Sequence, residues 1–157
     1  MSEFTVRPLN VNELPMLTKL FDYNDVYEMI AENTRSIENG ETDIFGLFKG
    51  TKLIGELHAI YRCDDEQKAI PNRRAYLCAF RIHKRYQGKG HGNFLLKSVI
   101  DIIAEKGYSE LTVGVEDNNE RAIYMYDKFG FNELVARKYE EYQGDGYEYN
   151  LYLKRLG

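Results

Sequence analysis

Three glycines at alternate positions, Gly88, Gly90 and Gly92, are the residues best placed to bind a ligand. Glycine has no Cβ, so the backbone amides beside it can approach a bulky anion closely. The apolar run at 75–80 before them is typical of a strand, and the run at 94–106 after them has helical periodicity. A turn from strand to helix leaves the first helical amides without intrahelical partners, at the positive end of the helix dipole. Phosphate is the usual ligand of such a helix start.

The charge around these glycines is basic, although the chain as a whole is acidic. Between residues 67 and 100 there is no Asp or Glu, and the basic residues are Lys68, Arg73, Arg74, Arg81, Lys84, Arg85, Lys89 and Lys97. The net charge of the whole chain is −4, so these eight positive charges leave −12 for the remainder. Such a basic island attracts a polyanion. The alternative is a flexible glycine turn beside a solvated basic face.

Two common phosphate-binding motifs do not fit these glycines. A P-loop needs a Gly five residues before Gly88 or Gly90, and the dinucleotide fingerprint needs a Gly where the chain has Asn93. The pattern that fits is R/Q-x-x-G-x-G/A, with Arg85, Gly88 and Gly90. This pattern resembles the coenzyme A pyrophosphate loop of the GNAT family of N-acetyltransferases. Six residues alone make a weak signature, so a second motif is needed.

A second motif follows one helix and one strand after the glycine loop. It resembles the family's signature N-x-x-A-x-x-x-Y-x-x-x-G-F, matched by Asn119, Ala122, Tyr126, Gly130 and Phe131. The resemblance covers the order of all elements and is strongest over residues 74–131. An ordinary capped amphipathic helix would explain the apolar positions of this motif, but it would not explain the glycine loop before it.

The resemblance implies an acetyl-CoA-dependent N-acetyltransferase, with acetyl-CoA as co-substrate and no metal. A primary amine of a small molecule or peptide would attack the thioester directly, through a tetrahedral intermediate. Tyr126 matches the family's tyrosine, whose phenol can act as general acid toward the leaving sulfur. Asn119 matches a residue that binds the pantetheine arm or helps to hold the cofactor groove.

The resemblance also assigns the cofactor-binding backbone. The backbone groups of Arg81 and Ile82, at the end of a splayed strand, would bind the pantetheine and the acetyl carbonyl. The pyrophosphate would be held by the amides of Gln87, Gly88, Lys89, Gly90, His91 and Gly92. The side chains of Lys84, Arg85 or Lys89 could reach the phosphates from the side.

The general base is less clear, because residues 73–82 contain no carboxylate, where many relatives place a glutamate. Glu56 and His58 lie two apart on the preceding predicted strand and therefore point to one face. They could remove the proton directly or through water, so Glu56 is the candidate base. The alternative is that both are solvated surface residues. A water chain or deprotonation in solution would also suffice.

Hydrophobic patterning predicts one domain over residues 1–157, of the α+β class. We expect a central mixed sheet of about seven strands with helices on both faces, and the resemblance implies a GNAT-like acyl-CoA N-acyltransferase fold. Strands are predicted at 4–9, 43–48, 53–61, 74–82, 111–115, 131–142 and 147–153. Helices are predicted from residue 10 or 12 to 21, from 24 or 25 to 39, at 94–106 and at 119–129.

Composition excludes several classes of protein. Hydrophobic residues make up 43% and charged residues 29%, as in soluble domains, and no apolar run is long enough for a membrane span. The first residues do not resemble a secretory signal, so a cytoplasmic location is expected. Cys63 and Cys78 form no CxxC pair, which indicates neither a disulfide framework nor a zinc site. The acidic balance argues against nucleic acid as a partner.

The charge of the N-terminal region bears on the acceptor. Residues 11–66 contain twelve acidic and five basic residues, and in the family the helical lid of this region shapes the acceptor pocket. A cationic amine, such as a polyamine, an aminoglycoside or a lysine side chain, is therefore one hypothesis, and a solvated acidic surface is the alternative. A monomer and a homodimer are both compatible with the sequence. The main alternative function is a non-catalytic acyl-CoA-binding or sensing module on the same fold, and a nucleotide-binding regulator is the second.

Overall fold

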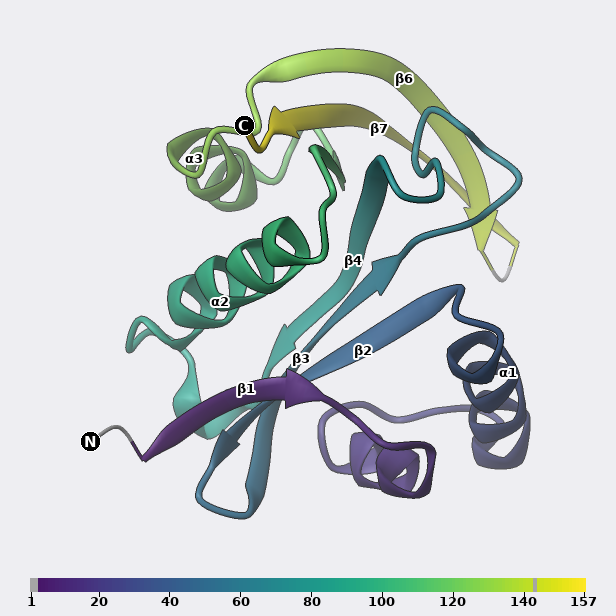
Figure 1. Cartoon of the computed structure of the whole chain (residues 1–157), viewed down its shortest axis with the longest axis vertical. Helices are drawn as coiled ribbons and strands as arrows, with labels where there is room; N and C mark the ends of the chain where they lie inside the picture. The colour runs from purple at the N-terminus through teal and green to yellow at the C-terminus, as the bar shows by residue number, and fades with distance from the viewer. Residues whose placement is uncertain (1–2, 143) are drawn as a thin grey trace. The chain divides into compact units, whose positions relative to one another are not determined.

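The strands of the computed structural model, which describes residues 3–142 and 144–157, form a mixed sheet (Figure 1). Its seven strands lie in the order β1-β2-β3-β4-β5-β7-β6. Their bounds are β1 (Phe4–Pro8), β2 (Thr42–Lys49), β3 (Lys52–Ile60), β4 (Arg74–Ile82), β5 (Glu110–Val115), β6 (Glu133–Tyr142) and β7 (Asp145–Arg155). The pairs β1·β2, β2·β3, β5·β7 and β6·β7 are antiparallel, and β4·β5 is parallel. The predicted α+β class and seven-stranded mixed sheet are confirmed.

The helical segments are η1 (Val11–Lys19), α1 (Val26–Glu38), η2 (Lys84–Tyr86), α2 (His91–Glu105) and α3 (Glu120–Lys128). Helix α1 begins after Asp25, whose carboxylate accepts a hydrogen bond from Glu28 N at 3.0 Å. The segment η1 differs from the expected α-helix because it is a 3₁₀-helix. It contains Pro15, which has no N–H to donate to the carbonyl four residues before it.

The chain divides into two compact units. One contains the described residues up to Ile60 together with Cys78–Ile102, and the other contains those of Tyr61–Leu77 and Ile103–Gly157. The first unit has a hydrophobic cluster of Leu9, Leu14, Leu17, Met29, Ile44, Phe48 and Leu53. Strand β4 has residues in both units. The expectation of a single domain over residues 1–157 stays a prediction.

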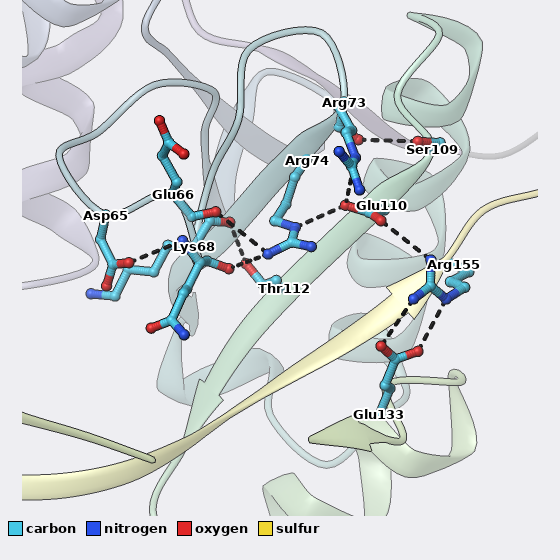
Figure 2. A network of polar contacts seen from close by, with 11 residues as sticks. Asp65, Glu66, Lys68, Arg73, Arg74, Ser109, Glu110, Thr112, Glu133 and Arg155 are labelled. Atoms are coloured by element: carbon cyan, nitrogen blue, oxygen red, sulfur yellow. Dashed lines mark hydrogen bonds and ion pairs between the residues drawn. The ribbon is translucent and has the colours of Figure 1, made fainter. Parts of the chain in front are cut away.

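A polar network centred on Glu110 lies within the second unit (Figure 2). Glu110 is only 3% exposed, and its Oε1 atom accepts a hydrogen bond from Arg74 Nε at 2.8 Å. Arg73 Nε lies 3.4 Å from the same oxygen, and Arg155 Nη1 lies 3.3 Å from Oε2. Burial disfavours the charged carboxylate, but the bond from Arg74 and the surrounding guanidinium charges outweigh it and hold the pKa of Glu110 below its ordinary value.

Membrane spans and metal sites were two further features considered in the sequence. None of the helices in residues 3–142 and 144–157 is both long enough and apolar enough to cross a membrane. Within the same residues, no group of three or more His, Cys, Asp or Glu side chains could hold a metal ion. The expectation about a secretory signal falls partly on residues 1 and 2, which lie outside the described residues.

Candidate active site

The glycine loop leads into helix α2, as the sequence predicts, but the short segment η2 lies between β4 and the loop, and α2 begins at His91 and not at residue 94. Gly88 and Gly90 have φ angles of +75° and +85°, in the left-handed region where glycine is favoured. A Cβ built at either position would meet no atom within 4 Å. Gln87 N donates to Lys84 O at 3.4 Å and Phe94 N to Gly90 O at 3.1 Å. The amides between them, at residues 88–93, have no acceptor among the described residues, so they can bind an anion.

Side chains of the loop fix the end of β4 beside it. Gln87 Nε2 donates to the Ile82 carbonyl at 2.8 Å, so one lone pair of this predicted pantetheine-binding carbonyl is already used by the loop. The register of β4 with β5 covers only Arg74–Leu77, and Ala79 has a φ of +51°. Arg81 and Ile82 therefore lie beyond the part of β4 that pairs with β5, where the family resemblance predicts ligand-binding backbone.

The tyrosine within the loop contacts lysines that sequence analysis did not single out. The Nζ atoms of Lys49, Lys52 and Lys89 lie 5.8, 5.5 and 6.0 Å from the centroid of the Tyr86 ring. Lys49 and Lys52 flank the turn between β2 and β3, more than 30 residues before the loop. No sequence signal could reveal this, because the approach of that turn to the loop is a tertiary feature.

Most side chains of the basic island are paired with acids, and the expectation that the island attracts a polyanion stays a prediction. Five of its eight side chains pair with acids: Lys68 with Glu140, Arg73 and Arg74 with Glu110, Arg81 with Glu56, and Lys97 with Asp101. Lys84, Arg85 and Lys89 have no ion pair with an acid among the described residues. The positive charge available to a ligand is thus concentrated at the glycine loop itself.

The buried carboxylate of Glu56 forms a cluster with His58 and Arg81. Glu56 is 0% exposed, and its Oε1 atom lies 2.8 Å from His58 Nε2 and 3.2 Å from Arg81 Nη1. Its other oxygen, Oε2, is buried without a hydrogen-bond partner among the described residues. The guanidinium of Arg81 also lies 3.9 Å from the centroid of the Phe21 ring. The alternative that Glu56 is a solvated surface residue is therefore wrong.

The second motif forms helix α3 in the other unit. Asn119 caps the helix, with its Oδ1 atom accepting a hydrogen bond from Ala122 N at 3.1 Å. Tyr126 is half-buried, and its ring packs edge-on against Phe131 at 5.6 Å between centroids and 76° between planes. The glycine loop, Glu56 and Arg81 belong to one unit, and Asn119 and Tyr126 belong to the other.

Substituting Gly90 tests whether the loop binds coenzyme A. Alanine at this left-handed position is strained by roughly 1–2 kcal/mol, so Gly90→Ala should weaken CoA binding about tenfold, as measured by isothermal titration calorimetry. Gly92→Ala is the matched control, because its Cβ would meet only Phe80 and Ile82, at ordinary distances of 3.7 and 3.9 Å. Equal CoA affinities for the two variants would contradict a role of the loop conformation in binding.

Comparison with known proteins identifies relatives of this chain. Residues 11–131 match the model of a family described as the acetyltransferase (GNAT) family. A spermine/spermidine N(1)-acetyltransferase of Bacillus subtilis is 35% identical over 88 residues, which are 55% of this chain and 57% of that protein. A [ribosomal protein bS18]-alanine N-acetyltransferase of Haemophilus influenzae is 43% identical over 53 residues, or 34% of this chain and 36% of that protein. The chain thus spans 57% of the length of the first of these curated relatives and 36% of the second.

Solved structures share the fold over nearly the whole chain. A GNAT family acetyltransferase from Elizabethkingia anophelis, solved with acetyl-CoA bound, superposes with a TM-score of 0.68 over 99% of this chain and all of that chain. Its sequence identity is 16%, so the likeness concerns the fold alone.

Proposed function

Since the chain belongs to the acetyltransferase (GNAT) family, we propose that it transfers the acetyl group of acetyl-CoA to a primary amine of a small molecule or peptide. The observation that carries the proposal is the glycine loop at the start of α2. There, the amides of residues 88–93 have no acceptor among the described residues, and the cationic residues Lys84, Arg85 and Lys89 lie within the same stretch of sequence. This combination suits a diphosphate.

The residues present fit acetyl-CoA as co-substrate. The amides from Gln87 to Gly92 would bind the pyrophosphate, and the backbone of Arg81 and Ile82 the pantetheine and acetyl carbonyl. Asn119 uses its Oδ1 atom to cap α3, which leaves its side-chain NH₂ to donate to the pantetheine arm. The bound acetyl-CoA in the acetyltransferase of Elizabethkingia anophelis supports this choice of co-substrate. When bound, the co-substrate supplies an activated acetyl thioester.

The reaction would proceed by direct attack of the amine on the thioester carbonyl, through a tetrahedral intermediate. Tyr126 would act as general acid and donate its phenolic proton to the leaving sulfur. Glu56 is the candidate for the base that accepts the proton of the attacking nitrogen, directly or through an intervening group. A buried carboxylate with an unpartnered Oε2 atom supports this role, because an unsatisfied buried acceptor in a native protein calls for an explanation.

The acceptor class that we propose is a cationic amine. The B. subtilis relative is named for spermine and spermidine, and acids outnumber bases by twelve to five over residues 11–66. A peptide amine is the second candidate, because the H. influenzae relative is named for an alanine of a ribosomal protein. Both candidates present a primary amine to the same thioester.

Release of the CoA thiol across an amine library, followed with the thiol reagent DTNB, tests the proposed function. We expect thiol release that requires both acetyl-CoA and an amine, and that is faster with cationic amines such as spermidine than with neutral ones. CoA binding by calorimetry without thiol release from any amine would instead favour the non-catalytic sensing module. A larger rise in melting temperature with ATP than with CoA would favour a nucleotide-binding regulator.

A further inference from the structure

The cluster around Glu56 allows the general base to be assigned more specifically, an inference that rests on the proposed function. Glu56 and His58 lie two residues apart on β3, so their side chains point to the same face. On β2 the residues opposite them are Gly46 and Ile44, which do not titrate. Arg81 on β4 supplies the positive charge of the cluster, and the Phe21 ring packs on its guanidinium. The cluster thus joins a carboxylate, an imidazole and a guanidinium, from Glu56, His58 and Arg81.

The hydrogen bonds of the cluster determine which nitrogen of His58 carries the proton. Arg81 is always protonated and can only donate, and an ionised carboxylate can only accept. With Arg81 Nη1 at 3.2 Å and His58 Nε2 at 2.8 Å from the same Glu56 oxygen, the carboxylate accepts from both. Neutral His58 is then the Nε2–H tautomer. Its Nδ1 atom carries no hydrogen and has a lone pair that can take a proton.

The side chain of His58 is more accessible to a substrate than that of Glu56. Glu56 is 0% exposed, so an amine cannot touch its carboxylate without rearrangement of the strands around it. The side chain of His58 is 14% exposed and is the member of the pair that reaches the surface. His58 is thus the more accessible of the two side chains, and its imidazole is hydrogen-bonded to the buried carboxylate. In many hydrolases a buried carboxylate likewise orients a histidine base, but there it binds Nδ1–H and Nε2 takes the proton, so the roles of the two ring nitrogens are exchanged in His58.

We propose that His58 is the catalytic base that contacts the acceptor, and that Glu56 is a positioning residue acting through it. As the amine nitrogen bonds to the thioester carbon, one N–H bond breaks and its proton passes to His58 Nδ1. The imidazolium formed is stabilised by the Glu56 carboxylate. The C–S bond then breaks, and the sulfur keeps the electron pair and takes a proton from Tyr126. His58 later loses its proton to water, and Tyr126 regains one from water.

The kinetics of His58→Gln, next to those of Glu56→Gln, test this assignment. We expect kcat to fall about 100-fold in His58→Gln, as is typical for loss of a general base, with CoA affinity within about twofold of wild type. The acidic limb of the kcat/KM pH profile should disappear in this variant. Added imidazole should restore part of the rate of His58→Ala, which a purely structural role would not allow. If His58→Gln keeps its kcat within about threefold while Glu56→Gln loses about 100-fold, Glu56 acts directly and the assignment is wrong.

A measurement on the wild-type protein covers the case in which a variant does not fold. The chain has three histidines, His58, His83 and His91, so the imidazole signals in a long-range ¹⁵N–¹H correlation spectrum can be assigned by substituting His83 and His91. His58 should be the Nε2–H tautomer, and an Nδ1–H tautomer would overturn the proposal. Absence of thiol release by wild-type protein with every amine would reject the proposed function itself. An active enzyme with unaffected His58 variants would reject only the role of His58.

Discussion

Replacing Tyr126 by Phe is expected to lower kcat by about 100-fold or more while leaving CoA affinity unchanged. The phenolic hydroxyl is the group proposed to protonate the leaving sulfur, and loss of a positioned general acid typically costs 10²–10⁴-fold in rate. The ring of Tyr126 packs edge-on against Phe131, and phenylalanine keeps that contact. Steady-state kinetics with acetyl-CoA and the best acceptor, together with calorimetric titration of CoA, would measure both effects.

Tyr124→Phe provides the control on the same helix. Tyr124 is 73% exposed and lies two residues before Tyr126 on α3, so removal of its hydroxyl should change neither kcat nor CoA affinity. A Tyr126→Phe enzyme as fast as Tyr124→Phe would reject the general acid. If neither the wild type nor the two variants turn over while all bind CoA, the non-catalytic module gains support.

The largest expected effect on stability comes from Glu110→Ala. Removing a carboxylate that is 3% exposed leaves Arg74, whose side chain is 13% exposed, without its ion pair. Breaking a buried pair from one side costs about 3–5 kcal/mol, and we expect the lower end because Arg73 and Arg155 are mostly exposed and can be solvated. The free energy of unfolding in urea at pH 7 would measure this loss.

Glu133→Ala is the matched control for Glu110, since it removes a carboxylate that pairs with Arg155 at the surface. Such exposed pairs contribute about 0–1 kcal/mol, so equal losses in the two variants would contradict the network.

The pKa of Glu110 is below its ordinary value in the folded protein. Its contribution is therefore present above the unfolded pKa, about 4.3 for glutamate, and is lost as pH falls through the folded pKa. The difference between wild type and Glu110→Ala should shrink accordingly below about pH 4.

Most of the fold could be predicted because local patterns report it directly. Glycines end the helices and turns, and apolar periodicity marks strands such as β4 and helices such as α2. The 3₁₀ geometry of η1 was not predicted, because its apolar residues keep helical spacing while Pro15 removes a backbone donor. The glycine loop and the capped helix α3 were predicted in the same way, since each is a short contiguous segment.

The surroundings of Glu56 could not be predicted from the sequence. Its contact with Arg81 depends on how β3 lies against β4. Its contact with His58 indicates a positioning role only because the carboxylate is buried, and burial cannot be read from the sequence. The ion pairs of the basic island could not be predicted for a related reason. Its partners, such as Glu110 and Glu140, are far along the chain, and a count of charges within a window cannot include them. Pairing across strands is invisible until the register is known.

The polar segment over residues 61–73 has little regular structure, yet it is attached at several points. Arg74 Nη1 donates to Gln67 O at 2.9 Å, Thr112 Oγ1 donates to Lys68 O at 2.7 Å, and Asp65 pairs with Lys138 at 3.0 Å. Because exposed polar loops usually accept insertions, the length and polarity of this segment suggest it as a place to insert an epitope tag or a fused peptide. These bonds argue the opposite, since new residues there would separate backbone carbonyls from strand side chains that hold them.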